Sequence, residues 1–161
     1  MNVRAALTPM VLILVAACAA PGAAPAAAID AIVRPVVARS YSDGGITLAA
    51  PQSAASKIDV VSAYRLCTSG VADCPGSVPS FAELALVSDS QYGQIDTAGG
   101  VSHSISARLS WVFTWQSIAC AQRLGPRAPA GAPTTSPCDW LVMIDATSGE
   151  YLYTYSGASA L

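Results

Sequence analysis

The sequence predicts an α+β domain: one helix packed on a small antiparallel sheet of about four strands, disulfide-stabilised, after a disordered N-terminal tether. Three observations lead to this fold class. Residues 56–67 place their apolar side chains along one face of a helix. Four later segments are strand-like, and the second and fourth of them alternate from residue to residue, as strands of a sheet with one covered face do. Four cysteines fall into two close pairs, each of which brackets a loop.

The N-terminal segment is typical of a bacterial export signal. Arg4 lies near the amino terminus, and the apolar run over 10–20 is shorter than the ~20 residues that a membrane span needs. The run ends in Val-Ala-Ala-Cys at Cys18, which resembles the bacterial lipobox, whose cysteine receives diacylglycerol. We therefore expect a lipoprotein signal peptide over 1–17 and a lipid on Cys18 that anchors the protein to the cell membrane on the extracytoplasmic side. The alternative is an ordinary secretory signal cut after the alanines at 26–28, which would leave a secreted soluble protein.

The segment after Cys18 is predicted to be a flexible Ala/Pro tether over 18–31. Its first eleven residues, CAAPGAAPAAA, carry no charge and no hydrophobic periodicity. The domain would then occupy 32–161. Residues 32–41 are strand-like, with Pro35 indicating an edge or an irregular start, and a turn precedes the run ITLAAP.

The predicted helix covers residues 56–67. Ser56 and Asp59 approximate a capping box, and Gly70 lies just past the end, where helices commonly stop. Because the apolar stripe covers only one face, we expect the helix to lie on a sheet. The stripe consists of Val60, Val61, Tyr64 and Cys67.

The four strands are expected at 81–88, 108–119, 139–146 and 150–156. In the second of these, Leu109, Trp111, Phe113 and Trp115 share one face. These aromatic residues predict a core beneath the helix; the alternative is that they line a ligand groove together with Trp140.

The last strand places Tyr151, Tyr153 and Tyr155 on one face. Tyrosine combines an apolar ring with a polar end and is favoured at protein interfaces. These three residues are therefore candidates for partner binding.

The cysteines predict two disulfides. If Cys18 carries the lipid, four cysteines remain, and export to an oxidising compartment favours their pairing. Cys120 and Cys138 flank a long Pro-, Ala- and Gly-rich loop between two strands, while Cys67 and Cys74 bracket a short loop after the helix. We expect these neighbouring pairs to be the bonded ones.

Composition and motifs argue against several classes of function. Charged residues make up 11% of the chain, the net charge is −2 and no Lys/Arg run exists, which argues against nucleic-acid binding. His103 is the only histidine, and no nucleophile-elbow motif, Cys-x-x-Cys pair or phosphate-binding glycine loop is present. We expect a protein that is not an enzyme, with no metal and no cofactor.

Residues 145–150, Asp-Ala-Thr-Ser-Gly-Glu, predict the corner of a β-hairpin. Gly149 would take a left-handed conformation, and Asp145 would accept hydrogen bonds from the backbone of the turn. The surrounding run LVMIDATSGEYLYTY resembles the C-terminal strand–turn–strand of PepSY-type domains. The stretches KIDVVSAYRL and RLSWVFTW resemble the family's preceding helix and Trp-containing strand, while the cysteines and the long loop depart from its simplest members.

The PepSY resemblance implies a small α+β domain of exported bacterial proteins that modulates peptidases by binding them, and it carries over no catalytic residues. We therefore expect a non-enzymatic, lipid-anchored protein of the cell envelope that binds a protein partner such as a peptidase. The alternative is an envelope structural or small-ligand-binding lipoprotein that uses its aromatic face.

Overall fold

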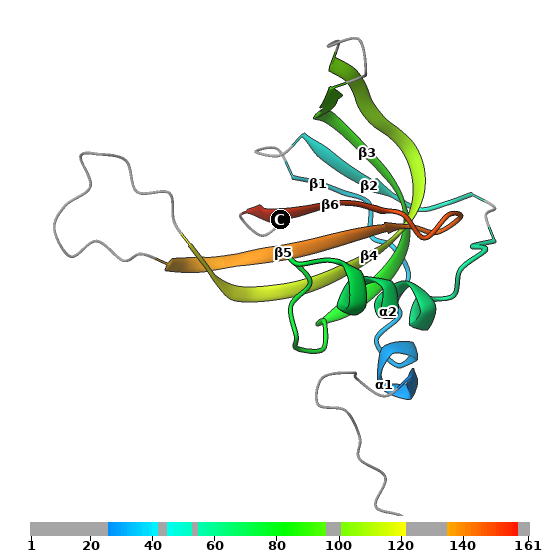
Figure 1. The fold of residues 1–161 in the computed structure, drawn as a ribbon, viewed down its shortest axis with the longest axis vertical. Helices are drawn as coiled ribbons and strands as arrows, with labels where there is room; N and C mark the ends of the chain where they lie inside the picture. The colour runs from blue at the N-terminus through cyan, green and yellow to red at the C-terminus, as the bar shows by residue number, and fades with distance from the viewer. Residues whose placement is uncertain (1–25, 42–44, 53–54, 96–100, 122–134, 158–161) are drawn as a thin grey trace, which may run out of the picture.

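The fold is an antiparallel sheet that carries a helix on one face. The computed structural model describes residues 26–41, 45–52, 55–95, 101–121 and 135–157, without the side chains of 91–95 and 101–104. In these ranges six strands form one sheet in chain order (Figure 1). They are β1 (Arg39–Tyr41), β2 (Ile46–Ala49), β3 (Phe81–Ile95), β4 (Val101–Ala121), β5 (Thr135–Asp145) and β6 (Tyr151–Gly157). Helix α1 (Ala26–Asp30) precedes β1, and helix α2 (Val60–Gly70) lies between β2 and β3.

The antiparallel α+β class with two disulfides is confirmed, but the sheet is larger than expected. The two short strands β1 and β2 extend it beyond β3. In β2, Ile46 and Leu48 are buried and alternate with the exposed Thr47 and Ala49. Four residues are enough to form this strand because it pairs with β3 on one side and with β1 on the other.

Residues 26–31 belong to the folded domain, although the sequence predicts a flexible tether as far as 31. Residues 26–30 form α1, and Ile29 is buried in the same apolar cluster as Tyr64 of α2. A residue with 1% exposure is held by packing and does not behave as part of a free linker. Residues 1–25, with the expected signal peptide and Cys18, lie outside the described ranges.

Helix α2 begins at Val60, one turn later than expected. Its cap is Asp59, whose carboxylate accepts hydrogen bonds from the backbone N–H and the hydroxyl of Ser62, both at 2.8 Å. The N–H groups of Lys57 and Ile58 instead donate to the carbonyl of Ala146. These two bonds hold a bend at residues 57–58 against the hairpin corner, so the helix does not start at Ser56.

The two faces of the sheet form two separate cores. The helix face buries the stripe of β4 that the sequence predicts, under α1 and α2. The opposite face buries a second cluster that draws on all six strands. Its members include Tyr41, Ile46, Leu48, Ala85, Val87, Val112, Leu141, Met143 and Tyr153.

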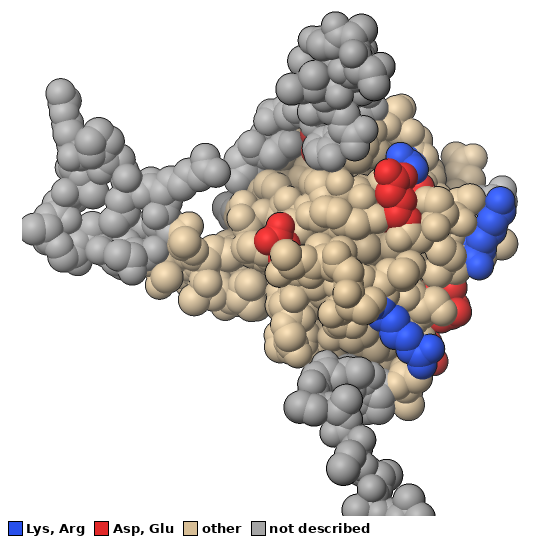
Figure 2. Space-filling view, in the orientation of Figure 1, with Lys and Arg blue, Asp and Glu red and all other residues tan. Residues whose placement is uncertain are grey.

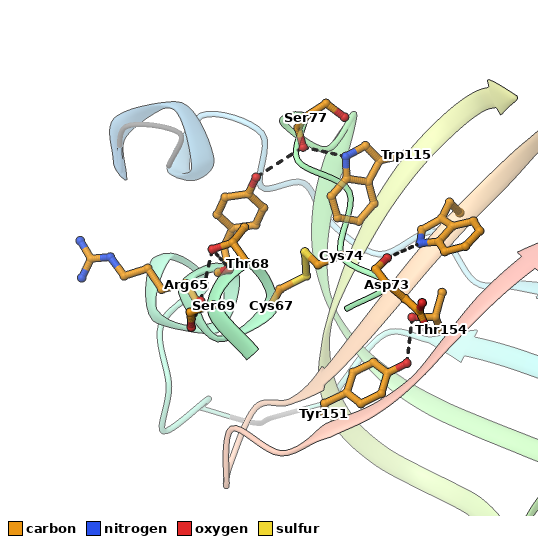
Figure 3. Close-up of a disulfide and its surroundings, with 12 residues drawn as sticks. Arg65, Cys67, Thr68, Ser69, Asp73, Cys74, Ser77, Trp115, Tyr151 and Thr154 are labelled. Carbon is orange, nitrogen blue, oxygen red and sulfur yellow. Dashed lines mark hydrogen bonds between the residues drawn. A yellow bond between two sulfur atoms is a disulfide. The ribbon is translucent and has the colours of Figure 1, made fainter. Parts of the chain in front are cut away.

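Both predicted disulfides are present. Cys67 at the end of α2 bonds Cys74 in the following loop, with 5.6 Å between their Cα atoms (Figure 3). Cys120 of β4 bonds Cys138 of β5, with 5.8 Å between their Cα atoms. The second pair is diagonal in the ladder, because Cys138 lies opposite Ile118.

The hairpin corner at 145–150 has the expected geometry. One oxygen of the Asp145 carboxylate accepts the backbone N–H groups of Thr147 and Ser148, both at 2.7 Å. Gly149 has a φ of 78°, the left-handed conformation that glycine adopts without strain. The polar residues at this corner are therefore explained by turn formation.

Candidate functional site

The three tryptophans attach the segments on either side of α2 to the sheet. Each indole N–H donates to a backbone carbonyl: Trp111 to Ile58 at 2.7 Å, Trp115 to Ser77 at 2.9 Å and Trp140 to Asp73 at 3.0 Å. The bond between Trp115 and Ser77 is visible in Figure 3. Trp111 and Trp115 are buried in the core beneath the helix, so these two rings do not line an open groove.

Trp140 does line an open pocket. Its half-buried ring borders a shallow space of about 330 Å³ between the loop after α2 and the end of β4. Cys74 and Cys120, one from each disulfide, lie on its walls together with Pro75 and Ile118. This pocket is the part of the aromatic face that can accept a small molecule.

The three tyrosines of β6 do not share a face. Tyr153 lies opposite Met143 and Tyr151 lies opposite Ile144, so Leu152 is an extra residue in β6, a β-bulge. One extra residue reverses the side to which the following side chains point. Tyr153 and Tyr155 therefore pack into the second core cluster. Tyr151 lies on the helix face, where it is 37% exposed and its hydroxyl is 2.9 Å from that of Thr154.

A buried charge cluster that the sequence analysis did not predict lies on the face opposite α2. Glu83 is completely buried, and its two oxygens accept hydrogen bonds from two arginines. Arg34 Nε lies 3.0 Å from Oε1 and Arg39 Nη2 lies 2.5 Å from Oε2. The available signal was Glu83 itself, a carboxylate at a core-facing position of the run FAELALV.

Arg39 is held in place by hydrogen bonds from all three of its nitrogens. Besides Glu83, its Nε donates to the hydroxyl of Tyr41 at 3.2 Å and its Nη1 to the carbonyl of Val37 at 3.1 Å. Burial lowers the pKa of Arg39, but the bonds to Glu83 and Tyr41 outweigh this effect and raise it overall. Arg39 is therefore a permanent counter-ion for Glu83.

A half-enclosed pocket of about 250 Å³ adjoins the charge cluster. Its lining includes both arginines, the aromatic residues Tyr41 and Phe81, and the polar residues Gln116 and Asp139. The guanidinium of Arg34 lies over the ring of Phe81, 3.0 Å from the centroid. The pocket thus combines a stacked cation with apolar walls, the usual make-up of a small-ligand site.

A second group of charges stabilises the hairpin corner. Arg108 Nε bonds the second oxygen of Asp145 at 2.5 Å, and its Nη2 bonds Glu150 at 2.8 Å. Burial raises the pKa of Asp145, but the hydrogen bonds from Ser148, Arg108 and Thr147 together lower it below its ordinary value. These charges are paired with one another and with the backbone of the turn.

Metal-binding and membrane-spanning features were sought in the same ranges. The described residues contain no group of three or more His, Cys, Asp or Glu side chains arranged to hold a metal ion. The side chain of His103 lies outside the described set. Among the described helices, none is long and apolar enough to cross a membrane.

The surface carries few charges on the face seen in Figure 2. Uncharged atoms cover most of it, and the Lys, Arg, Asp and Glu side chains gather mainly toward one edge. Large apolar side chains are exposed at five described positions, Val33, Val37, Leu66, Val78 and Tyr151.

Comparisons with known proteins found no relative. No family model, no curated protein and no solved structure matches this chain.

Proposed function

We propose that this protein is an exported, lipid-anchored extracytoplasmic protein that acts by binding a protein partner, such as a peptidase. The observation that carries the proposal is the use of the cysteines. Four of the five are paired in disulfides, and the fifth, Cys18, ends a lipobox-like motif. Disulfides persist in oxidising compartments outside the cytoplasm, where lipoproteins also reside.

The position of α1 supports lipidation over the ordinary secretory signal. Cleavage after the alanines at 26–28 would cut inside α1 and remove most of the helix that holds Ile29 in the core. Cleavage before Cys18 would leave α1 intact and would place seven residues between the lipid and the helix.

The helix face around Leu66 and Tyr151 is the surface proposed to meet the partner. Leu66 of α2 is 41% exposed, and its side chain lies against the hairpin corner at Gly149. Tyr151 is exposed two residues further on. Exposed tyrosine is enriched at the centre of protein interfaces, and Leu66 adds apolar surface at the same hairpin corner.

The peptidase part of the proposal rests on the PepSY resemblance of the hairpin and of its preceding helix. The structure supports the comparison only coarsely, because α2 packs against β4 and β5 as the α+β domain implied by that family requires. The six-stranded sheet and both disulfides are features that this resemblance does not include.

Lipidation is tested by expressing the full chain and Cys18→Ser in a bacterial host with its own lipoprotein pathway. The wild type should partition into detergent, and mass spectrometry should find a diacylglyceryl cysteine as its first residue. Cys18→Ser should lose the lipid, while Ala19→Ser, the matched control, should keep it. A wild-type N-terminus at or near Ile29, without lipid, would refute the anchor.

Partner binding is tested by crosslinking in the native envelope and then by direct titration of the purified partner. Leu66→Ala/Tyr151→Ala should weaken binding at least about tenfold, the loss expected when interface anchors are removed. Val37→Ala, which removes an even more exposed apolar side chain elsewhere, should leave affinity unchanged. If secreted or cell-wall peptidases show no binding at micromolar concentration, the peptidase part of the proposal is wrong.

The open pocket beside Trp140 favours a second candidate function, a small-ligand-binding envelope lipoprotein. Trp140 is the only one of the three tryptophans on an open pocket wall among the described residues, so it would report an apolar ligand through its fluorescence. Trp140→Phe should abolish the ligand-dependent part of the signal. An unchanged signal would place the ligand elsewhere.

A further inference from the structure

The pocket on the face opposite α2 contains one arginine that is fixed in place but incompletely bonded. Arg34 donates through Nε to Glu83 and stacks on Phe81. Its two terminal nitrogens, Nη1 and Nη2, donate to no residue that the structure describes. The side chain is 42% exposed, so these nitrogens are accessible from solvent.

The contrast with Arg39 shows which arginine is available to a ligand. Arg39 uses Nε, Nη1 and Nη2 on Tyr41, Val37 and Glu83. Removing Arg39 from Glu83 would leave a buried carboxylate short of a counter-ion. Arg34 can use its terminal N–H groups on a ligand without giving up its own bond to Glu83.

The terminal edge of a guanidinium matches a carboxylate, because two parallel N–H···O bonds join the planar groups. The pocket also provides apolar surface from Phe81, Tyr41 and the exposed Val37. A volume of about 250 Å³ restricts the occupant to a small molecule.

The charges around the pocket do not by themselves select an anion. Arg34 and Arg39 carry two positive charges and Glu83 one negative charge. Asp139, whose carboxylate accepts the N–H of Ser117 at 3.4 Å, adds a second negative charge to the lining. Recognition of an anion must therefore come from the geometry of the Arg34 fork.

We propose that this pocket binds the carboxylate group of a small aliphatic acid, with Arg34 as its bidentate donor and Phe81 and Val37 against the hydrocarbon chain. The site is separate from the Trp140 pocket, which lies on the helix face, and from the surface around Leu66 and Tyr151. It does not depend on the proposed protein partner.

The test compares an acid with its neutral isostere. Calorimetric titration of the purified protein with 4-methylpentanoate should give saturable binding, and 4-methylpentanamide should bind at least about tenfold more weakly. Arg34→Gln should weaken binding of the acid about tenfold to a hundredfold. Arg65→Gln, on the exposed part of α2, is the matched control and should change nothing.

Arg34→Lys tests the geometry separately from the charge. Lysine retains a positive partner for Glu83 but cannot form the planar fork. Arg34→Lys should therefore weaken binding of the acid nearly as much as Arg34→Gln does. It also serves if Arg34→Gln does not fold. Equal binding of acid and amide, full affinity in Arg34→Lys, or no saturable binding up to about 10 mM would overturn the proposal.

Discussion

Tyr41 of β1 and Tyr155 of β6 pack against each other, with ring centroids 5.1 Å apart and ring planes inclined at 58°. These strands are the two opposite edges of the sheet. Side chains from opposite edges can touch only if the sheet curls toward the face that both occupy. The sheet therefore encloses the second core cluster by itself, while α2 covers the first.

The curled sheet should depend on Tyr41. Tyr41→Ala removes a buried ring from the second cluster and should lower the free energy of unfolding by about 3 kcal/mol or more. Tyr151→Ala should change it by less than about 0.5 kcal/mol, because that ring is exposed on the other face. Urea denaturation measures both variants. Similar losses in the two variants would contradict the burial of Tyr41 in the second cluster and the exposure of Tyr151 on the other face.

The four cysteines of the domain should be unreactive in the exported protein. Alkylation of Cys18→Ser without reductant should modify no cysteine, and reduction before alkylation should expose all four. Replacing the pair Cys67/Cys74 by alanine should cost about 2.5 kcal/mol in the chain-entropy model. A free thiol at any of these positions before reduction would disprove the pairing.

Two glycines should respond to alanine in opposite directions. At Gly149 an added Cβ would lie 2.8 Å from Leu66 and 2.9 Å from Ile58, and the φ of 78° is unfavourable for alanine. Gly149→Ala should therefore destabilise the domain by more than about 1 kcal/mol. At Gly70, the last residue of α2, a Cβ meets nothing within 4 Å. Gly70→Ala should stabilise the domain by about 0.5 kcal/mol. Thermal unfolding of both variants shows whether each one raises or lowers stability. A Gly149→Ala variant as stable as the wild type would contradict the close contact of Gly149 with Leu66 and Ile58.

Features with a local cause were predictable from the sequence. The stripe of β4 follows from alternation alone, and the corner at Asp145 follows from turn chemistry within six residues. Each disulfide joins cysteines that bracket one loop, so neighbouring pairs were the natural choice.

Features that depend on distant residues were not predictable. Glu83 meets Arg39 and Arg34 across 44 and 49 positions of sequence. Of the strand-like stretch 32–41, strand β1 covers only the three residues that pair with β2, a bound that the stretch itself does not indicate. The bulge at Leu152 has no sequence signature, and it alone separates Tyr151 from the other tyrosines of β6.

The hairpin corner should lose stability in acid through Asp145. Its pKa in the folded protein is lower than that of an unfolded chain, about 3.9. The folded state therefore binds this proton less readily, so the carboxylate contributes stability above about pH 4 and loses it as the pH falls through the folded-state pKa. Asp145→Asn should be less stable than the wild type at pH 7, and the difference should shrink toward pH 3. Asp73→Asn, at an exposed position, is the control, and its stability should vary with pH as that of the wild type does. A difference that stays constant from pH 7 to pH 3 would exclude this carboxylate as the cause.

The pair Arg39–Glu83 should behave as a coupled buried unit. Arg39→Met leaves the fully buried Glu83 with Arg34 alone, whose side chain is 42% exposed, and should cost about 3 kcal/mol. Arg34→Met should cost less, because the more buried Arg39 remains. The double variant Arg39→Met/Glu83→Met removes both charges and should recover much of the loss, since an apolar pair of similar volume fits the buried site. Denaturant titrations of the wild type, the two single variants and the double variant yield the coupling energy. Strictly additive losses would mean that each residue acts through packing alone, and that the ion pair contributes nothing specific to the curled face of the sheet.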